Sequence, residues 1–116
     1  MFLDFCVKHI LFCFTFILMN VFLVHIILPD TFSKRFYELI SKQRQRVNNL
    51  LEERIMLSYS LDMERKQIWT VIEANNERQL MNILSTFPII KYVRVDIHEL
   101  AFHQAAPSIL SDVILN

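Results

Sequence analysis

The amino-acid sequence predicts a mainly α-helical, membrane-attached protein, and three observations favour this fold class. Residues 9–28 contain no Asp, Glu, Lys or Arg. Residues 32–73 contain neither Gly nor Pro and carry a helical apolar pattern, while strand-like alternation is confined to residues 89–97. The expected order is a lead (1–8), a transmembrane helix (9–28), a long amphipathic helix (29–74), and a second short helix with one or two β-strands (75–116).

Residues 9–28 form the predicted membrane span. Twenty residues of α-helix rise about 30 Å, which is the thickness of the hydrocarbon core of a bilayer. A secretory signal peptide is the alternative, but its apolar core is about 7–15 residues long and ends in small residues. The residues from Leu28 to Phe32 offer no such cleavage site. We therefore expect an uncleaved single-pass anchor.

The composition of the 116-residue chain excludes several classes of function. The chain contains no glycine, so it has no P-loop, no Rossmann fingerprint and no nucleophile elbow. Its 12 Lys and Arg residues balance 12 Asp and Glu residues, which argues against a nucleic-acid partner. Cys6 and Cys13 lie before or within the predicted span and lack metal-site spacing. We expect no catalytic residue, no metal and no cofactor, and hence no enzyme.

The long helix carries an apolar seam that Gln43 and Arg54 interrupt. The seam consists of Ile40, Val47, Leu50, Leu57 and Leu61. Its 4-3 spacing favours a coiled coil between two copies, a homodimer in which the polar positions define the register. A helix that packs on its own chain through the same stripe is the alternative.

A basic cluster follows the predicted span. It consists of Lys34, Arg35, Lys42, Arg44 and Arg46. A solvated helix face explains such a cluster, and contact with anionic lipid headgroups is the functional alternative. The positive-inside rule by itself places the residues after the span in the cytoplasm.

A second helix and a strand follow. Asn76 is a suitable N-cap with Gln79 at the capping-box position, and Pro88 ends the helix. The apolar stripe of this helix consists of Leu80, Ile83, Leu84 and Phe87. Alternation over residues 89–97 predicts a half-buried strand with Ile89, Val93, Val95 and Ile97 on one face together with Lys91. A second strand is expected near residues 100–104.

These elements resemble the input region of bacterial membrane sensors, chiefly sensor histidine kinases and diguanylate cyclases. The resemblance covers residues 55–97 and is carried by Trp69, the segment Asn75 to Leu80, and the segment Phe87 to Val95. It implies the start of an α+β, PAS-like sensor domain that is truncated before the rest of its sheet, its second membrane helix and its output domain. The expected sensor core consists of Trp69, Leu80, Leu84, Phe87, Val93 and Val95.

The resemblance implies a non-catalytic, membrane-anchored signal-input fragment of a two-component or cyclic-dinucleotide signalling protein. Its expected location is the bacterial inner membrane with the C-terminal part extracytoplasmic. The membrane, a second copy of the chain and a larger membrane signalling protein are the expected partners. The alternative is a small single-span membrane protein that binds lipid or a larger membrane partner through its basic amphipathic helix.

One local pattern is rejected. His98 and Glu99 resemble the start of a histidine-kinase phosphoacceptor box, but Ala101 and Phe102 follow where that box has Arg and Thr. A metal pair of His98 and His103 is also disfavoured, because a separation of five residues places them on opposite faces of a strand.

Overall fold

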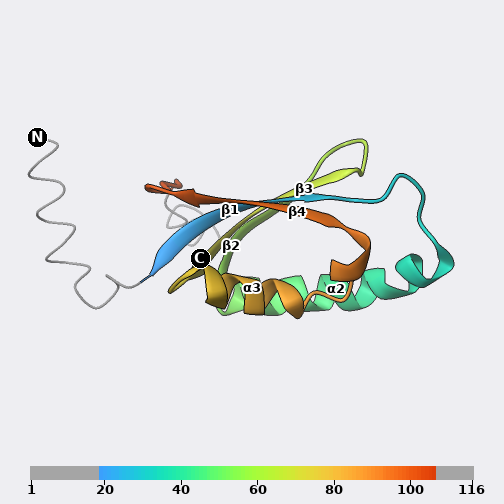
Figure 1. Cartoon of the computed structure of the whole chain (residues 1–116), viewed down its shortest axis with the longest axis horizontal. Coiled ribbons are helices and arrows are strands. Elements are labelled where there is room, and N and C mark those ends of the chain that lie inside the picture. Colours follow the sequence, from blue (N-terminus) through green and yellow to red (C-terminus); the bar gives the residue numbers. More distant parts are fainter. Residues whose placement is uncertain (1–18, 107–116) are drawn as a thin grey trace, which may run out of the picture.

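The computed structural model describes residues 19–106, which form a four-stranded antiparallel sheet with two α-helices against one of its faces (Figure 1). Along the chain the elements are β1 (Asn20–Ile27), α2 (Lys34–Glu52), β2 (Met56–Leu61), β3 (Gln67–Ala74), α3 (Glu77–Ser85), the 3-10 helix η2 (Ile90–Tyr92) and β4 (Arg94–Leu100). The fold class is therefore α+β, and the prediction of a mainly α-helical protein is wrong.

The strand order in the sheet is β2-β3-β1-β4, with every neighbouring pair antiparallel. In this register Val24 of β1 lies opposite Thr70 of β3 on one side and opposite Ile97 of β4 on the other. The chain forms two strand-helix-strand units, β1-α2-β2 and β3-α3-β4, whose strands interleave. Strand-helix-strand crossovers are almost always right-handed, and two right-handed crossovers in this strand order place both helices on the same face of the sheet.

The central strand β1 corrects the predicted transmembrane helix. Eight residues of that stretch, Asn20–Ile27, form β1, which is hydrogen-bonded to β3 along one edge and to β4 along the other. Residues 9–18 lie outside the described residues. Within residues 19–106, no helix combines the length and the apolar character needed to cross a bilayer. The predicted single-pass inner-membrane location, which depended on a helix over residues 9–28, is therefore wrong.

The sequence of β1 resembles a membrane span because both faces of the strand carry mostly apolar residues. Phe22, Val24 and Ile26 are buried beneath the helices, and the alternate residues are half-buried on the other face. A strand with apolar residues on both faces forms a nearly continuous apolar run without polar alternation. Periodicity therefore does not separate this strand from part of an apolar helix.

Helix α2 is much shorter than the predicted helix over residues 29–74. Ser33 caps its first turn by accepting a hydrogen bond from the Phe36 N–H at 3.1 Å. The helix ends at Glu52, and Arg54 then adopts a left-handed conformation with φ of 60°. The chain turns there into β2, and the remainder of the predicted helix forms the β2–β3 hairpin. Strand β3 is rich in β-branched and aromatic residues, which favour pleated structure.

The turn between β2 and β3 is organised by Asp62. Its Oδ1 accepts hydrogen bonds from the backbone N–H of Lys66 at 2.7 Å and of Gln67 at 3.1 Å. These hydrogen bonds lower the pKa of the Asp62 carboxyl, and the bond from the Lys66 N–H has the largest effect. Arg65, with φ of 61°, holds the left-handed position of the turn.

The second half of the chain follows its predicted pattern more closely. Asn76 caps α3 by accepting a hydrogen bond from the Gln79 N–H at 2.8 Å, and the Gln79 side chain accepts one from the N–H of Asn75, one residue before the N-cap that a standard capping box uses. The predicted helix start is thus confirmed. Strand β4 begins only at Arg94, because η2 occupies the start of the expected strand. Within the described residues no strand follows Leu100, so the second predicted strand is wrong.

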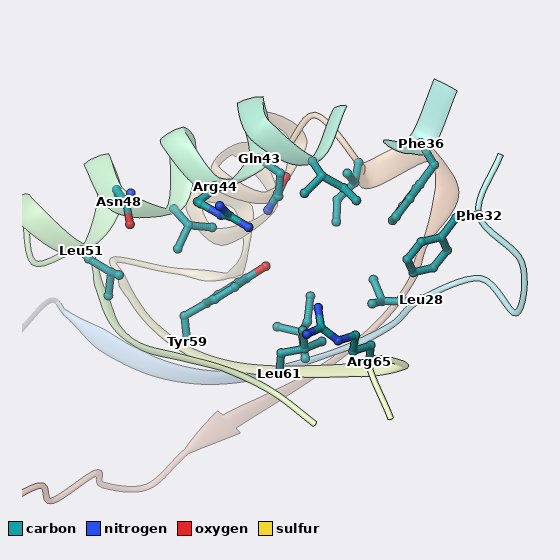
Figure 2. Close-up of a pocket in the computed structure, with 14 residues that line it drawn as sticks. Leu28, Phe32, Phe36, Gln43, Arg44, Asn48, Leu51, Tyr59, Leu61 and Arg65 are labelled. Carbon is teal, nitrogen blue, oxygen red and sulfur yellow. The ribbon is translucent and has the colours of Figure 1, made fainter. Parts of the chain in front are cut away.

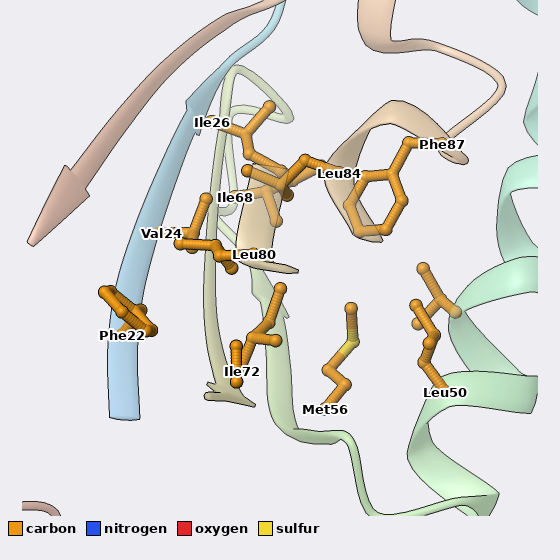
Figure 3. Packing of buried hydrophobic residues seen from close by; sticks show 12 residues of the cluster. Phe22, Val24, Ile26, Leu50, Met56, Ile68, Ile72, Leu80, Leu84 and Phe87 are labelled. Carbon is orange, nitrogen blue, oxygen red and sulfur yellow. The ribbon is translucent and has the colours of Figure 1, made fainter. Parts of the chain in front are cut away.

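The main hydrophobic core lies between the sheet and the two helices (Figure 3). Its buried members are Phe22, Val24, Ile26, Val47, Leu50, Met56, Ile68, Ile72, Ala74, Leu80, Leu84 and Phe87. Val95 and Ile97 of β4 pack against this core, on the face that their alternation predicted. A large side chain buried in this way contributes about 1.5–3 kcal/mol. A second, smaller cluster of Phe36, Leu39 and Ile89 lies at the N-terminal end of α2.

We expect Asp62 to make the stability of the fold depend on pH in the acid range. A carboxyl whose pKa is lowered in the folded state stabilises the fold above its unfolded pKa, and this contribution is lost as the pH falls through the folded pKa. The ordinary pKa is 3.8, so the loss occurs below that value. Urea unfolding of the wild type and of Asp62→Asn at a series of pH values from about 7 down to about 2 measures it. The variant should lose less stability over the acid part of the series, and identical pH dependence would contradict the role of Asp62.

Candidate functional site

A cavity of about 440 Å³ lies between α2 and the sheet, close to the smaller hydrophobic cluster (Figure 2). Nine apolar residues line it: Leu28, Phe32, Phe36, Ile40, Val47, Leu51, Leu61, Ile68 and Ile89. Five further residues, Gln43, Arg44, Asn48, Tyr59 and Arg65, add polar groups. The volume falls within the range of about 300–1,000 Å³ found for small-molecule sites, which are likewise mostly apolar with a few polar groups.

The position of Gln43 explains where the cavity arises. The residues of α2 that face the sheet are Phe36, Leu39, Gln43, Val47 and Leu50. Phe36 and Leu39 belong to the smaller cluster, and Val47 and Leu50 belong to the main core. Gln43 therefore occupies the middle of an otherwise apolar helix face, between two regions of close packing. An apolar side chain at this position would join the two clusters.

The amide of Gln43 is buried without a hydrogen-bond partner. Gln43 is 5% exposed, and neither its Oε1 nor its Nε2 makes a hydrogen bond to another described residue. The other buried polar side chain of the core, Thr70, donates a hydrogen bond from its hydroxyl to the Ser58 carbonyl at 2.7 Å. Leaving a buried polar group unsatisfied costs about 1–3 kcal/mol, so native proteins rarely do so without a reason.

Tyr59 lies across the cavity from α2, on strand β2 (Figure 2). Burial raises the pKa of its hydroxyl, and the nearby Gln43 amide offsets part of that rise. The two groups lie near each other without a hydrogen bond between them. The hydroxyl is consequently neutral at ordinary pH and is able to donate or accept one hydrogen bond.

Two arginines add positive charge to the lining of the cavity. Arg44 extends from α2, and Arg65 extends from the β2–β3 turn (Figure 2). Both residues are exposed. No His, Cys, Asp or Glu is among the described residues that line the cavity. Within residues 19–106 no group of three such residues is placed to hold a metal ion. The lining is thus equipped to bind a molecule and offers Tyr59 as its one weakly acidic side chain.

The residues of the predicted seam do not share one exposed surface. Val47 and Leu50 are buried beneath α2, Ile40 lines the cavity, and Leu57 and Leu61 lie on β2. The coiled coil is therefore wrong, because the sheet of the same chain occupies the inner face of α2. That arrangement is the alternative in which the helix packs on its own chain. The homodimer itself stays a prediction.

The residues of the predicted sensor core separate into two groups. Leu80, Leu84 and Phe87 are buried in the main core, and Val93 and Val95 pack against it. They form part of the core of an α+β fold whose fourth strand pairs with β1, so no missing sheet is needed to cover them.

Trp69 lies on the opposite face of the sheet and is 37% exposed. Its ring stacks on that of His25, with centroids 5.2 Å apart. The Nε2 atom of His25 lies 2.8 Å from Gln67 Oε1, a hydrogen bond that also holds the imidazole on this face. The sequence-based prediction places Trp69 in the core because it assigns this position to a helix, whereas Trp69 lies on strand β3.

The basic cluster lies along α2 and contributes one residue, Arg44, to the cavity. The Nε atom of Arg46 donates a hydrogen bond to the Thr86 hydroxyl at 2.9 Å, and Arg35 forms an exposed ion pair with Glu38 at 3.5 Å. The remaining members, Lys34 and Lys42, are exposed.

Sequence reasoning missed Tyr59 and Arg65 as components of a site. The available signal was Gln43, an amide in an apolar stripe, which was interpreted as a register device between two helices. Tyr59 and Arg65 carry no comparable signal, because their proximity to α2 depends on the pairing of β2 with β3 and on the crossover between β1 and β2.

Comparison with known proteins supports the fold and leaves the family unassigned. No family model matches the chain, and no curated protein matches it. The crystal structure of muconolactone isomerase matches with a TM-score of 0.62 at 17% sequence identity, covering 74% of this chain and 93% of that chain. An uncharacterised protein from Thermotoga maritima matches with a TM-score of 0.49 at 14% identity, covering 71% of this chain and 98% of that chain.

The likeness to muconolactone isomerase shows the fold alone, because the sequence identity is low. It nevertheless contradicts the resemblance to bacterial membrane sensors, since the chain forms a small α+β fold of another kind. The prediction of a membrane-anchored signal-input fragment is therefore wrong. The alternative of a single-span protein that binds lipid or a membrane partner depended on the same span and is wrong with it.

We expect Gln43→Leu to stabilise the ligand-free protein. The substitution replaces two unsatisfied buried polar atoms by apolar atoms of similar volume, which should raise the free energy of unfolding by about 1 kcal/mol or more. Urea unfolding measures the difference, and Gln45→Leu on the exposed side of the same helix is the matched control. A loss of stability in Gln43→Leu with no change in the control would contradict an unsatisfied amide.

Proposed function

We propose that this protein binds a small, largely apolar organic molecule in the cavity between α2 and the sheet. The size and apolar lining of the cavity support the proposal, as does its location between rigid elements. Helix α2 forms one wall and strands β2 and β3 form the other. Preformed concave sites of this kind are the usual location of small-molecule binding.

The unsatisfied Gln43 amide is the observation that carries the proposal. A side chain selected only for packing at this position would be apolar, as are its neighbours Leu39 and Val47 on the same face. Instead the chain places an amide, with a donor and an acceptor, on a residue that lines the cavity. The atoms are covered in this structure, and a change in the Gln43 side-chain torsions would bring them to a ligand. A polar atom of the ligand would then supply the missing hydrogen bond.

The proposed role is binding without a chemical step. Catalysis by proton transfer uses a group whose pKa lies near the working pH, most often His, Asp or Glu, and the described lining holds none of them. Tyr59, whose pKa is raised, is a poor base at neutral pH. The neighbour of known structure is named as an isomerase, but at 17% identity that name supplies no residue role to this chain.

We expect the uncharged fluorescent probe N-phenyl-1-naphthylamine to bind in the cavity. Its fluorescence should increase on titration into the protein, because the naphthyl ring leaves water for an apolar site. Ile40→Trp should abolish the increase by filling the cavity with a larger side chain. Ser41→Trp, which adds the same ring on the exposed side of α2, should leave it unchanged.

Circular dichroism and urea unfolding of both variants verify that the fold is retained. Equal probe binding by the wild type and a folded Ile40→Trp variant would place the probe outside the cavity and contradict the proposal. The absence of any saturable binding to the wild type would contradict it as well.

A further inference from the structure

The charges around the cavity define the class of ligand more closely, on the premise that the proposed binding function holds. Arg44 and Arg65 contribute guanidinium groups from opposite walls, and no Asp or Glu lines the cavity. Within residues 19–106, neither arginine forms an ion pair with a carboxylate. The cavity thus combines an apolar interior with positive charge that the described part of the chain does not neutralise.

The backbone at Arg65 supports a role for its side chain. Its φ of 61° lies in the left-handed region, which disfavours residues with a Cβ and is usually occupied by Gly or Asn. Arg65 adopts this conformation in the turn that Asp62 organises, and its side chain extends toward the cavity (Figure 2). Arg54 is the other described non-glycine residue with positive φ, and it does not line the cavity. The two positions therefore form a natural pair for comparison.

The aromatic residues of the lining define the opposite end of the ligand. Phe32 and Phe36 lie in contact, with ring centroids 4.4 Å apart, and both line the cavity together with Tyr59. Aromatic rings pack favourably on other flat apolar groups through stacked or edge-to-face contacts. A compact, planar, apolar body fits this lining better than a polar one.

We propose that the cavity binds the anion of an aromatic carboxylic acid. The ring lies among Phe32, Phe36 and Tyr59, and the carboxylate lies toward Arg44 and Arg65. A guanidinium group presents two parallel N–H donors that match the two oxygens of a carboxylate, which makes arginine well suited to this planar anion. A hydroxyl or carbonyl group on the ring would supply the partner that the Gln43 amide lacks.

The test compares 2-naphthoate with the neutral 2-naphthamide, which has the same ring and a similar shape. Each displaces N-phenyl-1-naphthylamine from the full chain in a fluorescence titration at neutral pH and low salt. The wild type should bind naphthoate about tenfold more tightly than naphthamide, because hydrogen bonds to a charged group are roughly twice as strong as neutral ones. Arg65→Gly and Arg44→Gln should each reduce this ratio, and the double variant should abolish it.

Two control variants separate the site from general effects of charge and backbone. Arg54→Gly removes a positive charge and a left-handed Cβ outside the cavity, and Lys42→Gln removes a positive charge from the exposed side of α2. Both should keep the wild-type ratio. Because glycine suits the left-handed position, Arg65→Gly should also fold at least as stably as the wild type.

Three results would overturn the inference. They are equal affinity of the wild type for naphthoate and naphthamide, equal loss in Arg65→Gly and Arg54→Gly, and equal loss in Arg44→Gln and Lys42→Gln. In each case the proposed function would still hold if the wild type binds N-phenyl-1-naphthylamine and the Ile40→Trp variant does not. Failure of that uncharged probe to bind would instead contradict the proposed function itself.

Discussion

The pairing of β1 on both edges is the constraint on which the rest of the structure depends. Strand β1 joins β3 on one side and β4 on the other, so it connects the hairpin of the middle of the chain to the last described strand. Without β1, β4 would have no neighbour among the described residues, and α3 would cover an interrupted sheet. Its alternate residues Phe22, Val24 and Ile26 also form the centre of the main core. One strand therefore supplies both the hydrogen-bonding continuity of the sheet and part of the apolar surface beneath the helical layer.

The cavity is a consequence of how α2 covers this sheet. Its C-terminal half packs into the main core through Val47 and Leu50, and its N-terminal end packs with Ile89 in the smaller cluster through Phe36 and Leu39. Close packing at both ends holds the helix in place while Gln43 interrupts the apolar contact between them. The space in between is preserved because the elements around it are held elsewhere, so a ligand would enter a site that the fold has already formed.

The electrostatic character of the cavity has a similarly local origin. Arg44 faces the cavity from α2, whereas Arg35 and Arg46 of the same helix have Glu38 and Thr86 as partners. Arg65 lies in the turn that Asp62 organises. It occupies a left-handed position there, and the chain contains no glycine that could do so. Two exposed cations beside an apolar surface, with no carboxylate in the lining, suit the amphipathic anion that we propose as ligand. The apolar part gains from burial, and the charge stays near solvent, where its desolvation cost is small.

The sequence by itself determined those features that depend on neighbours in the chain. These include the capped start of α3 at Asn76, and the inward alternation of Val95 and Ile97. Local hydrogen bonds and side-chain periodicity specify these features. Only the tertiary structure decided that Asn20–Ile27 is a strand, because an apolar run has the same composition whether it is buried by lipid or by two neighbouring strands and a helical layer. The cavity was equally beyond local reasoning. Gln43 lies on α2, whereas Tyr59 and Arg65 lie on the β2–β3 hairpin, and what brings them together is the packing of α2 against that hairpin.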